Sequence, residues 1–266
     1  MNPRMRKIGR FGLESPHVEH ERLRPERDDV GSRVRAFVFD LALKQHFKWA
    51  EERFDHFVRA MDLQPGMKIV DLGGGTGDFF YKFGRKIAHL GCQLAVADIC
   101  EPALAIARSR GLNTISMKED CVEFDDRDFD IVFCNSVIEH VTLPKHEVWQ
   151  CYDDATFSTK SFSRQREFAN AIRRMADGYF VQTPHRDFII EAHTWYPRWV
   201  ARRSRRSFIK ILTLTNRFWV QKTIPDFNLL DEHQMRDLFP DADCIFVNRK
   251  LGFKKEIIAY KRPRSR

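Results

Sequence analysis

Residues 69 to 80 read IVDLGGGTGDFF, in which an apolar run ends in an aspartate and leads into a turn rich in glycine. Four of the five residues from 73 to 77 are glycine. Glycine permits positive φ, and it lets a ligand approach the backbone where a Cβ atom would block it. A glycine-rich turn between a strand and a helix is typical of folds that bind a nucleotide-like ligand at the carboxyl edge of a parallel sheet. The sequence therefore predicts such a site at this turn.

The spacing of the glycines excludes two common phosphate-binding motifs. The GxGxxG pattern of dinucleotide-binding folds is not completed, because Asp78 or Phe80 stands where its third glycine would be. The GxxxxGKS/T pattern of P-loop nucleoside triphosphatases does not occur in the sequence. The pattern that fits is DxGxGxG, formed by Asp71, Gly73, Gly75 and Gly77.

Apolar periodicity and turn residues outline the elements around this turn. Strands are predicted at 67–72, 92–98, 113–117, 128–135 and 179–183, and helices at 77–89, 101–109, 164–177 and 232–239. The third of these helices is predicted to end at Gly178, after a polar loop and weak helix over 142–163. One or two amphipathic helices over 32–61 precede the first strand, and a hairpin over 243–261 follows the last helix. Strands that alternate with helices predict an α/β fold with a doubly wound, mostly parallel sheet.

Composition limits the class of protein. Hydrophobic residues make up 43% of the chain and charged residues 31%, which predicts a single domain over 33–266 after a loosely ordered, charged segment over 1–32. No apolar run approaches the roughly 20 residues that span a bilayer, and the first residues lack the apolar core of a secretory signal. The six cysteines form no CxxC pair, which is typical of reduced thiols. We therefore expect a cytoplasmic protein.

Residues 185–230 break the alternation of strands and helices and are predicted to form a cap or insertion. No acidic residue occurs between His193 and Pro225, whereas tryptophans stand at 195, 199 and 219. The basic residues of this stretch are Arg198, Arg202, Arg203, Arg205, Arg206, Lys210, Arg217 and Lys222. Interleaved aromatic and basic side chains favour contact with a membrane surface or with an amphiphilic anionic acceptor through residues 195–222. RNA is the competing partner, and a solvated surface is the plain alternative.

The DxGxGxG turn resembles motif I of the class I S-adenosylmethionine-dependent methyltransferases. The resemblance continues in Asp98, 21 residues after Gly77 at the end of the second strand, in EDC at 119–121, and in FDDRDFDIVFCNSVIEHV at 124–141. It implies a Rossmann-like seven-stranded sheet with a reversed last strand, and S-adenosylmethionine as cofactor. TPHR and LLDEHQMRDLFP, later in the chain, resemble bacterial methyltransferases that modify small molecules or cell-surface glycans and lipids.

The resemblance also implies roles for individual residues. The turn and the helix after it would hold the methionine carboxylate, and Asp98 would accept both ribose hydroxyls. Asp120 would accept from the adenine amino group, the N–H of Cys121 would meet a ring nitrogen, and main-chain groups near Asn135 would flank the methionine amine. The predicted cofactor-binding residues are Asp71, Gly73, Gly74, Gly75, Gly77, Asp98, Ile99, Asp120, Cys121, Asn135 and Ser136.

Three polar residues are candidates for the acceptor side of the site. Transfer needs a nucleophile aligned with the sulfonium carbon, and a hydroxyl nucleophile often needs a base. Glu139 and His140 follow the fourth strand, and His193 follows the fifth, near His185 and Glu191. We predict that Glu139, His140 and His193 assist transfer, with purely local hydrogen bonding as the alternative. Two histidines and a carboxylate can ligate a divalent ion, but no tight ligand spacing is present, so the sequence predicts no metal.

These features together predict an enzyme that transfers a methyl group to a small-molecule or lipid- or glycan-linked acceptor, at an oxygen atom. One alternative is an RNA methyltransferase. The other is a catalytically silent scaffold that keeps the cofactor fold. The intact glycine turn and Asp98 favour an enzyme over the scaffold.

Overall fold

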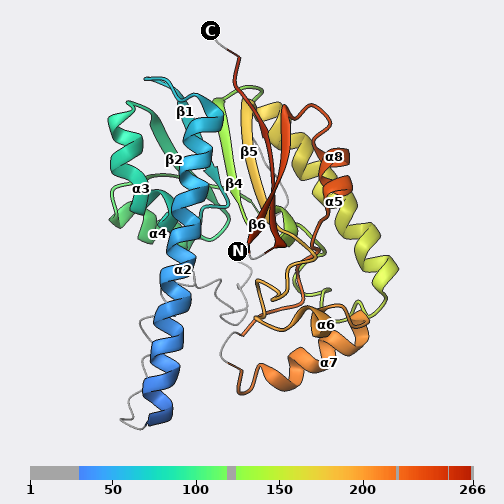
Figure 1. The fold of residues 1–266 in the computed structure, drawn as a ribbon. Coiled ribbons are helices and arrows are strands. Elements are labelled where there is room, and N and C mark those ends of the chain that lie inside the picture. Colours follow the sequence, from blue (N-terminus) through green and yellow to red (C-terminus); the bar gives the residue numbers. More distant parts are fainter. Residues whose placement is uncertain (1–29, 119–123, 220–221, 251, 265–266) are drawn as a thin grey trace, which may run out of the picture.

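The described part of the chain holds seven strands and seven α-helices (Figure 1). It comprises residues 30–118, 124–219, 222–250 and 252–264 of a computed structural model. The strands are β1 (Lys68–Leu72), β2 (Gln93–Asp98), β3 (Asn113–Ser116), β4 (Phe129–Asn135), β5 (Ala176–Pro184), β6 (Cys244–Lys250) and β7 (Phe253–Lys261). The helices are α2 (Val30–Met61), α3 (Asp78–His89), α4 (Glu101–Ser109), α5 (Asp154–Met175), α6 (Arg198–Ala201), α7 (Arg205–Thr215) and α8 (Glu232–Leu238), with a 3-10 turn η1 (Ile138–His140) after β4.

The seven strands form one sheet in the order β3-β2-β1-β4-β5-β7-β6. Strands β1 to β5 pair in parallel, whereas β7 runs antiparallel to both β5 and β6. This confirms the predicted seven-stranded, mostly parallel sheet with a reversed last strand. The chain moves outward from β1 to β3 and then crosses to β4 on the other side of β1. The carboxyl ends of β1 and β4 therefore flank a topological switch point, where open α/β sheets bind their ligands.

Strand β4 is buried on both faces. Ile131 and Phe133 belong to one core cluster, Val132 and Cys134 belong to the other, and all four residues are 0% exposed. Successive residues of a strand point to opposite faces, so a central parallel strand requires a continuous apolar run. The four consecutive apolar residues IVFC therefore allow β4 to lie in the middle of the sheet, with a core on each face.

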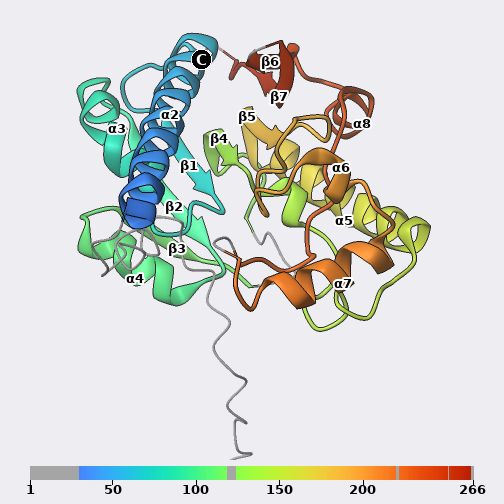
Figure 2. The same ribbon diagram turned by 60° about the horizontal axis from the view of Figure 1, so that its bottom comes forward.

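Helices α2 and α3 cover one face of the sheet, and α5 and α8 cover the other (Figure 1, Figure 2). On the first face, Phe57 of α2 and Phe80 of α3 pack around Phe133 of β4, and the ring centroids of Phe57 and Phe133 are 4.9 Å apart. On the second face, Ile172 of α5 and Met235 of α8 are both fully buried against the sheet. These two apolar layers hold the carboxyl edge of the strands in a fixed position.

Helix α5 begins ten residues earlier than the helix predicted from residue 164. Its start is set by Asp153, whose carboxylate accepts a hydrogen bond from the Thr156 N–H at 2.7 Å and so caps the helix. The second half of the polar loop and weak helix predicted over 142–163 forms the first half of α5, so the weak helix is present and is continuous with the helix predicted from residue 164. The sequence indicated this part of the helix only weakly because its residues, DATFSTKSFS, are rich in types that favour caps and turns.

Gly178 lies inside β5 and does not end a helix, so this prediction is wrong. Helix α5 ends at Met175, and β5 begins directly at Ala176. A Cβ atom at position 178 would come within 2.6 Å of the Pro263 nitrogen. Glycine is therefore required for the close approach of the chain that follows β7.

Residues 185–230 connect β5 to α8 and include α6 and α7, which lie beyond one end of the sheet (Figure 1). Because β5 leads directly into this segment, that end is the carboxyl edge of the parallel strands. The segment predicted to be loosely ordered, 1–32, lies almost wholly outside the described residues, which begin with α2. Among the described helices, none combines the length and the apolar character needed to cross a bilayer.

Candidate active site

The glycine-rich turn lies between β1 and α3, at the carboxyl edge of the sheet. Gly73, Gly75 and Gly77 have φ values of 75°, 54° and 71°, which fall in the left-handed region that glycine enters without strain. A Cβ atom at Gly73 would come within 2.6 Å of the Val137 side chain. At Gly75, by contrast, the described residues place only Asp98 Oδ2 within 4 Å of a Cβ atom, at 3.9 Å. The described residues therefore leave room for a ligand beside the Gly75 backbone, and we call this space the opening at Gly75.

The carboxylate of Asp98 faces this opening. Its Oδ2 accepts a hydrogen bond from the Gly75 N–H at 2.8 Å, and its Oδ1 accepts one from the Cys100 N–H at 2.8 Å. The side chain is thereby fixed at the end of β2, and each carboxylate oxygen keeps a further lone pair for a ligand. Ile99, the next residue, is 40% exposed. The arrangement suits a ligand that carries hydroxyl groups.

Asp71 lies beneath the turn. It is 2% exposed, and a Cβ atom at Gly74 would strike its carboxylate. Burial, and then the negative charge of Asp98, raise the pKa of Asp71 to about 8. Its Oδ2 has no hydrogen-bond partner among the described residues. A positively charged ligand over the turn would favour the ionised form of this carboxyl group.

The turn and its two carboxyl groups fit S-adenosylmethionine, which carries two ribose hydroxyls and a positively charged sulfur. Gly75 leaves room for it, Asp98 offers acceptor oxygens, and Asp71 offers a buried carboxyl group that the positive sulfur would favour in its ionised form. The two residues predicted to contact adenine, Asp120 and Cys121, lie outside the described residues.

Asn135 and Ser136 continue this edge at the end of β4. Asn135 Oδ1 accepts a hydrogen bond from Arg53 Nη1 at 2.8 Å, and the Ser136 hydroxyl donates to Gln182 Oε1 at 2.9 Å. Ser136 has a φ of 56°, a backbone strain that is often found at functional sites. Val137 then contacts the glycine turn, as described above. The end of β4 and the turn therefore form one continuous surface.

A buried ionic network supports the end of β4. Glu256 of β7, 1% exposed, forms an ion pair with Arg53 of α2 and accepts hydrogen bonds from Gln182 Nε2 at 3.1 Å and Asn248 Nδ2 at 2.8 Å. Burial disfavours the charge on Glu256, but the charges of Arg53 and Lys255 outweigh burial and lower its pKa to about 2. No local pattern in the sequence indicates this network, because Arg53 and Glu256 are 203 positions apart and belong to no common motif.

The three predicted catalytic residues meet between η1 and the segment that follows β5. Glu139 is 0% exposed; its Oε2 accepts a hydrogen bond from the Thr183 hydroxyl at 2.9 Å, and its Oε1 lies 3.6 Å from His193 Nε2. The ring centroids of His140 and His193 are 4.6 Å apart, edge to face. Because η1 directly follows Val137, this cluster adjoins the glycine turn. The structure thus brings the three residues together, next to the predicted cofactor site.

A carboxylate holds each histidine at Nδ1. His193 Nδ1 lies 2.6 Å from Glu191 Oε1, and His140 Nδ1 lies 3.2 Å from Asp226 Oδ1. Burial disfavours protonation of His193, but the carboxylates of Glu139 and Glu191 beside it outweigh burial and raise its pKa to about 10. In the absence of another cation, His193 is therefore a hydrogen-bond donor at neutral pH and not a base.

The sequence analysis did not identify three further members of this cluster. Thr183 binds Glu139 from the end of β5, Asp226 orients His140, and the Phe227 ring stacks on His193 at a centroid distance of 4.6 Å. Asp226 is 86 positions from His140. Its role depends on the path of residues 185–230 back onto η1, which no local pattern in the sequence indicates.

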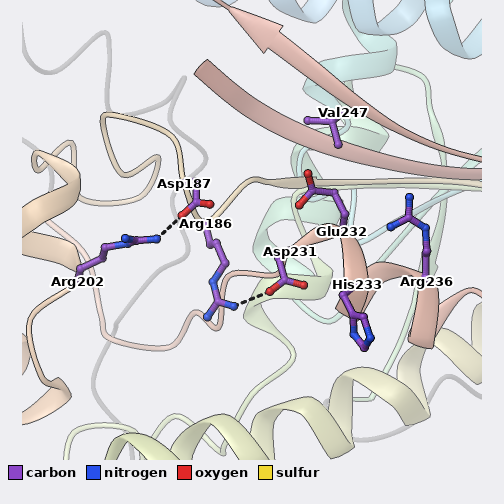
Figure 3. Close-up of a pocket in the computed structure, with 8 residues that line it drawn as sticks. All are labelled: Arg186, Asp187, Arg202, Asp231, Glu232, His233, Arg236 and Val247. Atoms are coloured by element: carbon purple, nitrogen blue, oxygen red, sulfur yellow. Dashed lines mark hydrogen bonds and ion pairs between the residues drawn. The ribbon is translucent and has the colours of Figure 1, made fainter. Parts of the chain in front are cut away.

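His185 lies outside this cluster, beside a charged pocket of about 640 Å³ (Figure 3). Its Nε2 donates to Glu232 Oε2 at 3.0 Å, and its Nδ1 accepts from the Asp187 N–H at 2.9 Å. Within the pocket, Figure 3 shows Arg186 paired with Asp231 and Arg202 paired with Asp187. The pocket is lined by Arg186, Asp187, Arg202, Asp231, Glu232, His233, Arg236 and Val247. None of these residues belongs to the glycine turn or to the Glu139 cluster, so the pocket is separate from the candidate site.

Arg205 does not belong to the basic surface predicted over residues 195–222. It is 6% exposed, and its guanidinium donates to the carbonyl oxygens of Val148, Cys151 and Pro225 at 2.7–2.8 Å. It also lies over the Phe157 ring, 3.3 Å from the centroid. Arg205 therefore anchors the start of α7 to the loop before α5.

Other side chains of the basic segment are exposed. Trp199 is 67% exposed, Leu214 60% and Phe218 70%. Along α7, a pocket of about 690 Å³ combines apolar and basic side chains. It is lined by Tyr152, Arg206, Ile209, Lys210, Thr213, Leu214 and Arg217.

Comparison with known proteins shows what the chain is similar to. Residues 46–244 match the family described as "Methyltransferase domain". The chain is 31% identical over 93 residues to the ubiquinone/menaquinone biosynthesis C-methyltransferase UbiE of Shewanella pealeana, and 32% identical over 93 residues to UbiE of Shewanella halifaxensis. Each match covers 32% of this chain and 37% of the relative, so the chain spans little more than a third of the curated relatives it matches.

The fold is shared with a solved structure. The PH0226 protein of Pyrococcus horikoshii OT3 superposes with a TM-score of 0.51 at 16% sequence identity, over 83% of this chain and 92% of that one. This likeness shows the fold. Together with the match over residues 46–244, it confirms the predicted family: the chain belongs to the methyltransferase-domain family, among the class I S-adenosylmethionine-dependent methyltransferases.

Proposed function

We propose that the protein transfers the methyl group of S-adenosylmethionine to an oxygen atom of a small-molecule or lipid-linked acceptor. The observation that carries the proposal is the opening at Gly75, which has the Asp98 carboxylate beside it and the Glu139 cluster next to it. The names of the UbiE relatives, C-methyltransferases of quinone biosynthesis, support a small-molecule acceptor. The polar cluster favours oxygen as the attacking atom.

The glycine turn would hold the cofactor. N–H groups of the turn and of the first turn of α3 would bind its carboxylate, and Asp98 would accept its ribose hydroxyls. Asp71 would stabilise its positive charge from below the turn. When bound, the cofactor would supply a methyl carbon on a positively charged sulfur, and transfer of this carbon to the acceptor oxygen would leave the electrons of the broken carbon–sulfur bond on sulfur.

The Glu139 cluster would bind the acceptor. Glu139 is fully buried and the His193 side chain is 12% exposed, a setting that would keep most water from the reacting atoms and strengthen their electrostatic interactions. The His140 side chain is 32% exposed, so a proton lost from the acceptor hydroxyl has a path to solvent on this side. The three side chains would orient the acceptor and stabilise the negative charge that develops on its oxygen.

Residues 185–230 would act as a cap over the acceptor. His193, Asp226 and Phe227 all belong to this segment and all contact the cluster or one another. Arg205 fixes α7 to the body of the domain through three main-chain carbonyl groups. The identity of the acceptor would therefore depend on this segment, while the glycine turn binds the cofactor.

Transfer of a radiolabelled methyl group tests the proposal directly. The protein is incubated with labelled S-adenosylmethionine and a cell extract, which is then separated into lipid, water-soluble small-molecule and RNA fractions. We expect label in the lipid or small-molecule fraction, and none with Gly75→Val. Label in RNA alone would contradict the proposed acceptor. Cofactor binding without label in any fraction would support the catalytically silent scaffold.

The exposed part of the basic segment supports contact with anionic lipid. Trp199, Leu214 and Phe218 offer apolar surface, and Lys210 and Arg206 lie beside Leu214 in the α7 pocket. Each lysine near an anionic membrane contributes about 1 kcal/mol to binding.

Vesicle sedimentation measures this contact. We expect binding to phosphatidylglycerol vesicles but not to phosphatidylcholine vesicles, and we expect Lys210→Gln to weaken it about fivefold. The matched control is Lys68→Gln, which removes an exposed lysine at the amino end of β1, at the opposite edge of the sheet. Equal binding by both variants would contradict the assignment to α7. Salt-sensitive binding to single-stranded RNA in place of vesicles would favour the RNA alternative.

A further inference from the structure

We infer that Glu139, His140 and His193 bind one divalent first-row transition-metal ion, such as Zn²⁺, Mn²⁺ or Co²⁺. Each residue offers one ligand atom, and the three atoms lie within 4.8 Å of one another. Oxygen and nitrogen ligands about 2.1 Å from a shared tetrahedral ion are roughly 3.4 Å apart. Glu139 Oε1 and His193 Nε2, at 3.6 Å, are already near this separation.

Glu139 offers an oxygen without a hydrogen-bond partner. The residue is 0% exposed, its Oε2 is bound by Thr183, and its Oε1 accepts no hydrogen bond from the described residues. A buried carboxylate oxygen without a hydrogen bond is costly, and a cation bound between it and His193 Nε2 would satisfy it. The backbone of η1 is also fixed: the Asn228 N–H donates to the Glu139 carbonyl at 2.8 Å, and Gln165 Nε2 donates to the Ile138 carbonyl at 2.9 Å.

The two histidines are oriented as metal ligands usually are. Glu191 binds His193 at Nδ1, and Asp226 binds His140 at Nδ1, which leaves Nε2 of each ring as the nitrogen available to a metal. A carboxylate on the second ring nitrogen fixes the tautomer and makes the ligand more basic. Glu191 is itself held by the N–H and the hydroxyl of Thr194, at 2.7 Å and 2.6 Å. The supporting shell is therefore rigid before any ion binds.

The charge of the cluster also favours a cation. Glu139, Glu191 and Asp226 are each less than 5% exposed and surround the two histidines. Buried carboxylates require pairing or metal coordination, and a divalent ion between the two histidines would supply positive charge beside all three.

The donor set indicates the kind of ion and its use. Two imidazoles and one carboxylate suit zinc, iron or manganese better than magnesium or calcium, which prefer oxygen ligands. Three protein ligands leave at least one coordination position open. This step rests on the proposed function. The hydroxyl oxygen of the acceptor would occupy the open coordination position, where the metal would lower the pKa of that hydroxyl group. The metal site would then take the place of a side-chain base.

Binding of Co²⁺ alone, followed by its visible absorption, tests the site without any need for activity. The protein is first dialysed against a chelator, and Co²⁺ is then titrated into it. We expect one tightly bound ion per chain. Glu139→Gln and His193→Gln should weaken binding 100-fold or more, and Glu191→Gln, which removes only an orienting carboxylate, should weaken it about 10- to 100-fold.

The matched control is His233→Ala, which removes an 85% exposed histidine that lies 3.3 Å from Asp237 on the surface of α8. It should leave Co²⁺ binding unchanged. His140→Gln alters the most exposed ligand and is the variant to use if the buried ones fail to fold, as judged by circular dichroism. No tight binding by the wild type, or equal binding by folded wild-type, His140→Gln and His193→Gln proteins, would overturn the inference.

Calorimetric titration of the same preparations with S-adenosylhomocysteine separates this inference from the proposed function. Cofactor binding without Co²⁺ binding would refute the metal site and leave the methyltransferase proposal standing. Co²⁺ binding without cofactor binding would refute the proposed function and leave the metal site standing.

Discussion

At the scale of single residues, the glycine turn shows which glycines serve the fold and which serves a ligand. Gly73 and Gly74 are required because Val137 and Asp71 occupy the space where their Cβ atoms would be. Gly75 faces open space beside Asp98. The sequence predicted the whole turn from its spacing, but it did not distinguish these roles, because the distinction depends on side chains from β1 and from the segment after β4.

Replacing Gly75 by valine should abolish cofactor binding. The new side chain fills the opening and is strained at a φ of 54°, at a cost of about 1–2 kcal/mol in stability. Gly111→Val is the control, because Gly111 also has positive φ, 79°, and has open space around it, but it lies after α4. We expect similar losses of thermal stability for both variants, whereas calorimetry should detect no binding of S-adenosylhomocysteine only for Gly75→Val. Wild-type affinity in Gly75→Val would exclude the opening as the binding site.

The raised pKa of Asp71 should appear in the pH dependence of stability. The pKa of this group is about 8 in the folded protein and about 3.8 in the unfolded chain. Between these values the unfolded chain ionises while the folded protein does not, so the free energy of unfolding falls as pH rises from about 4 to about 8. Above about 8 both states are ionised and this contribution becomes constant.

Asp71→Asn should remove this slope. Denaturant unfolding of both proteins between about pH 5 and 8 should show the stability of the wild type falling relative to the variant by an amount on the order of a few kcal/mol. Parallel pH profiles for the two proteins would show that the carboxyl group of Asp71 is ionised throughout in the folded state.

At the scale of elements, periodicity predicted the strands and most helices, whereas contacts between distant segments set the exceptions. All seven strands were predicted near their observed positions, because buried parallel strands are continuous apolar runs. The place of Gly178 was wrong and the first half of α5 was indicated only as a weak helix, since a close crossing near Pro263 and a polar helix face leave little periodic signal. Arg205 is a similar case, because its charge indicates a surface residue and its contacts bury it.

Arg205 and Arg206 form a matched pair for testing how α7 is held. Arg205→Met removes the donors to three carbonyl groups, and we expect it to lower the free energy of unfolding by about 2–4 kcal/mol. Arg206 lies on the α7 pocket and is exposed, so Arg206→Met should change stability by less than about 0.5 kcal/mol. Equal stabilities of the two variants in urea unfolding would contradict the anchoring role of Arg205.

At the scale of the whole molecule, the candidate site has a cofactor half, which the sequence indicated, and an acceptor half, whose assembly it did not indicate. The cofactor half lies at the ends of β1 and β2 and is encoded in one contiguous motif and one strand-end acid, so the sequence indicated it. The acceptor half is assembled from η1 and from the distant segment 185–230. The sequence named Glu139, His140 and His193 as candidates, but their convergence, and the support from Asp226, depend on the path of that segment.

A crystal structure of the protein with S-adenosylhomocysteine tests the central claim most directly. We predict that the ribose hydroxyls bind the Asp98 carboxylate, that the amino-acid end meets the N–H groups of the glycine turn, and that the sulfur faces the Glu139 cluster. Ligand density elsewhere, or an Asp98 side chain turned away from the sugar, would contradict the account.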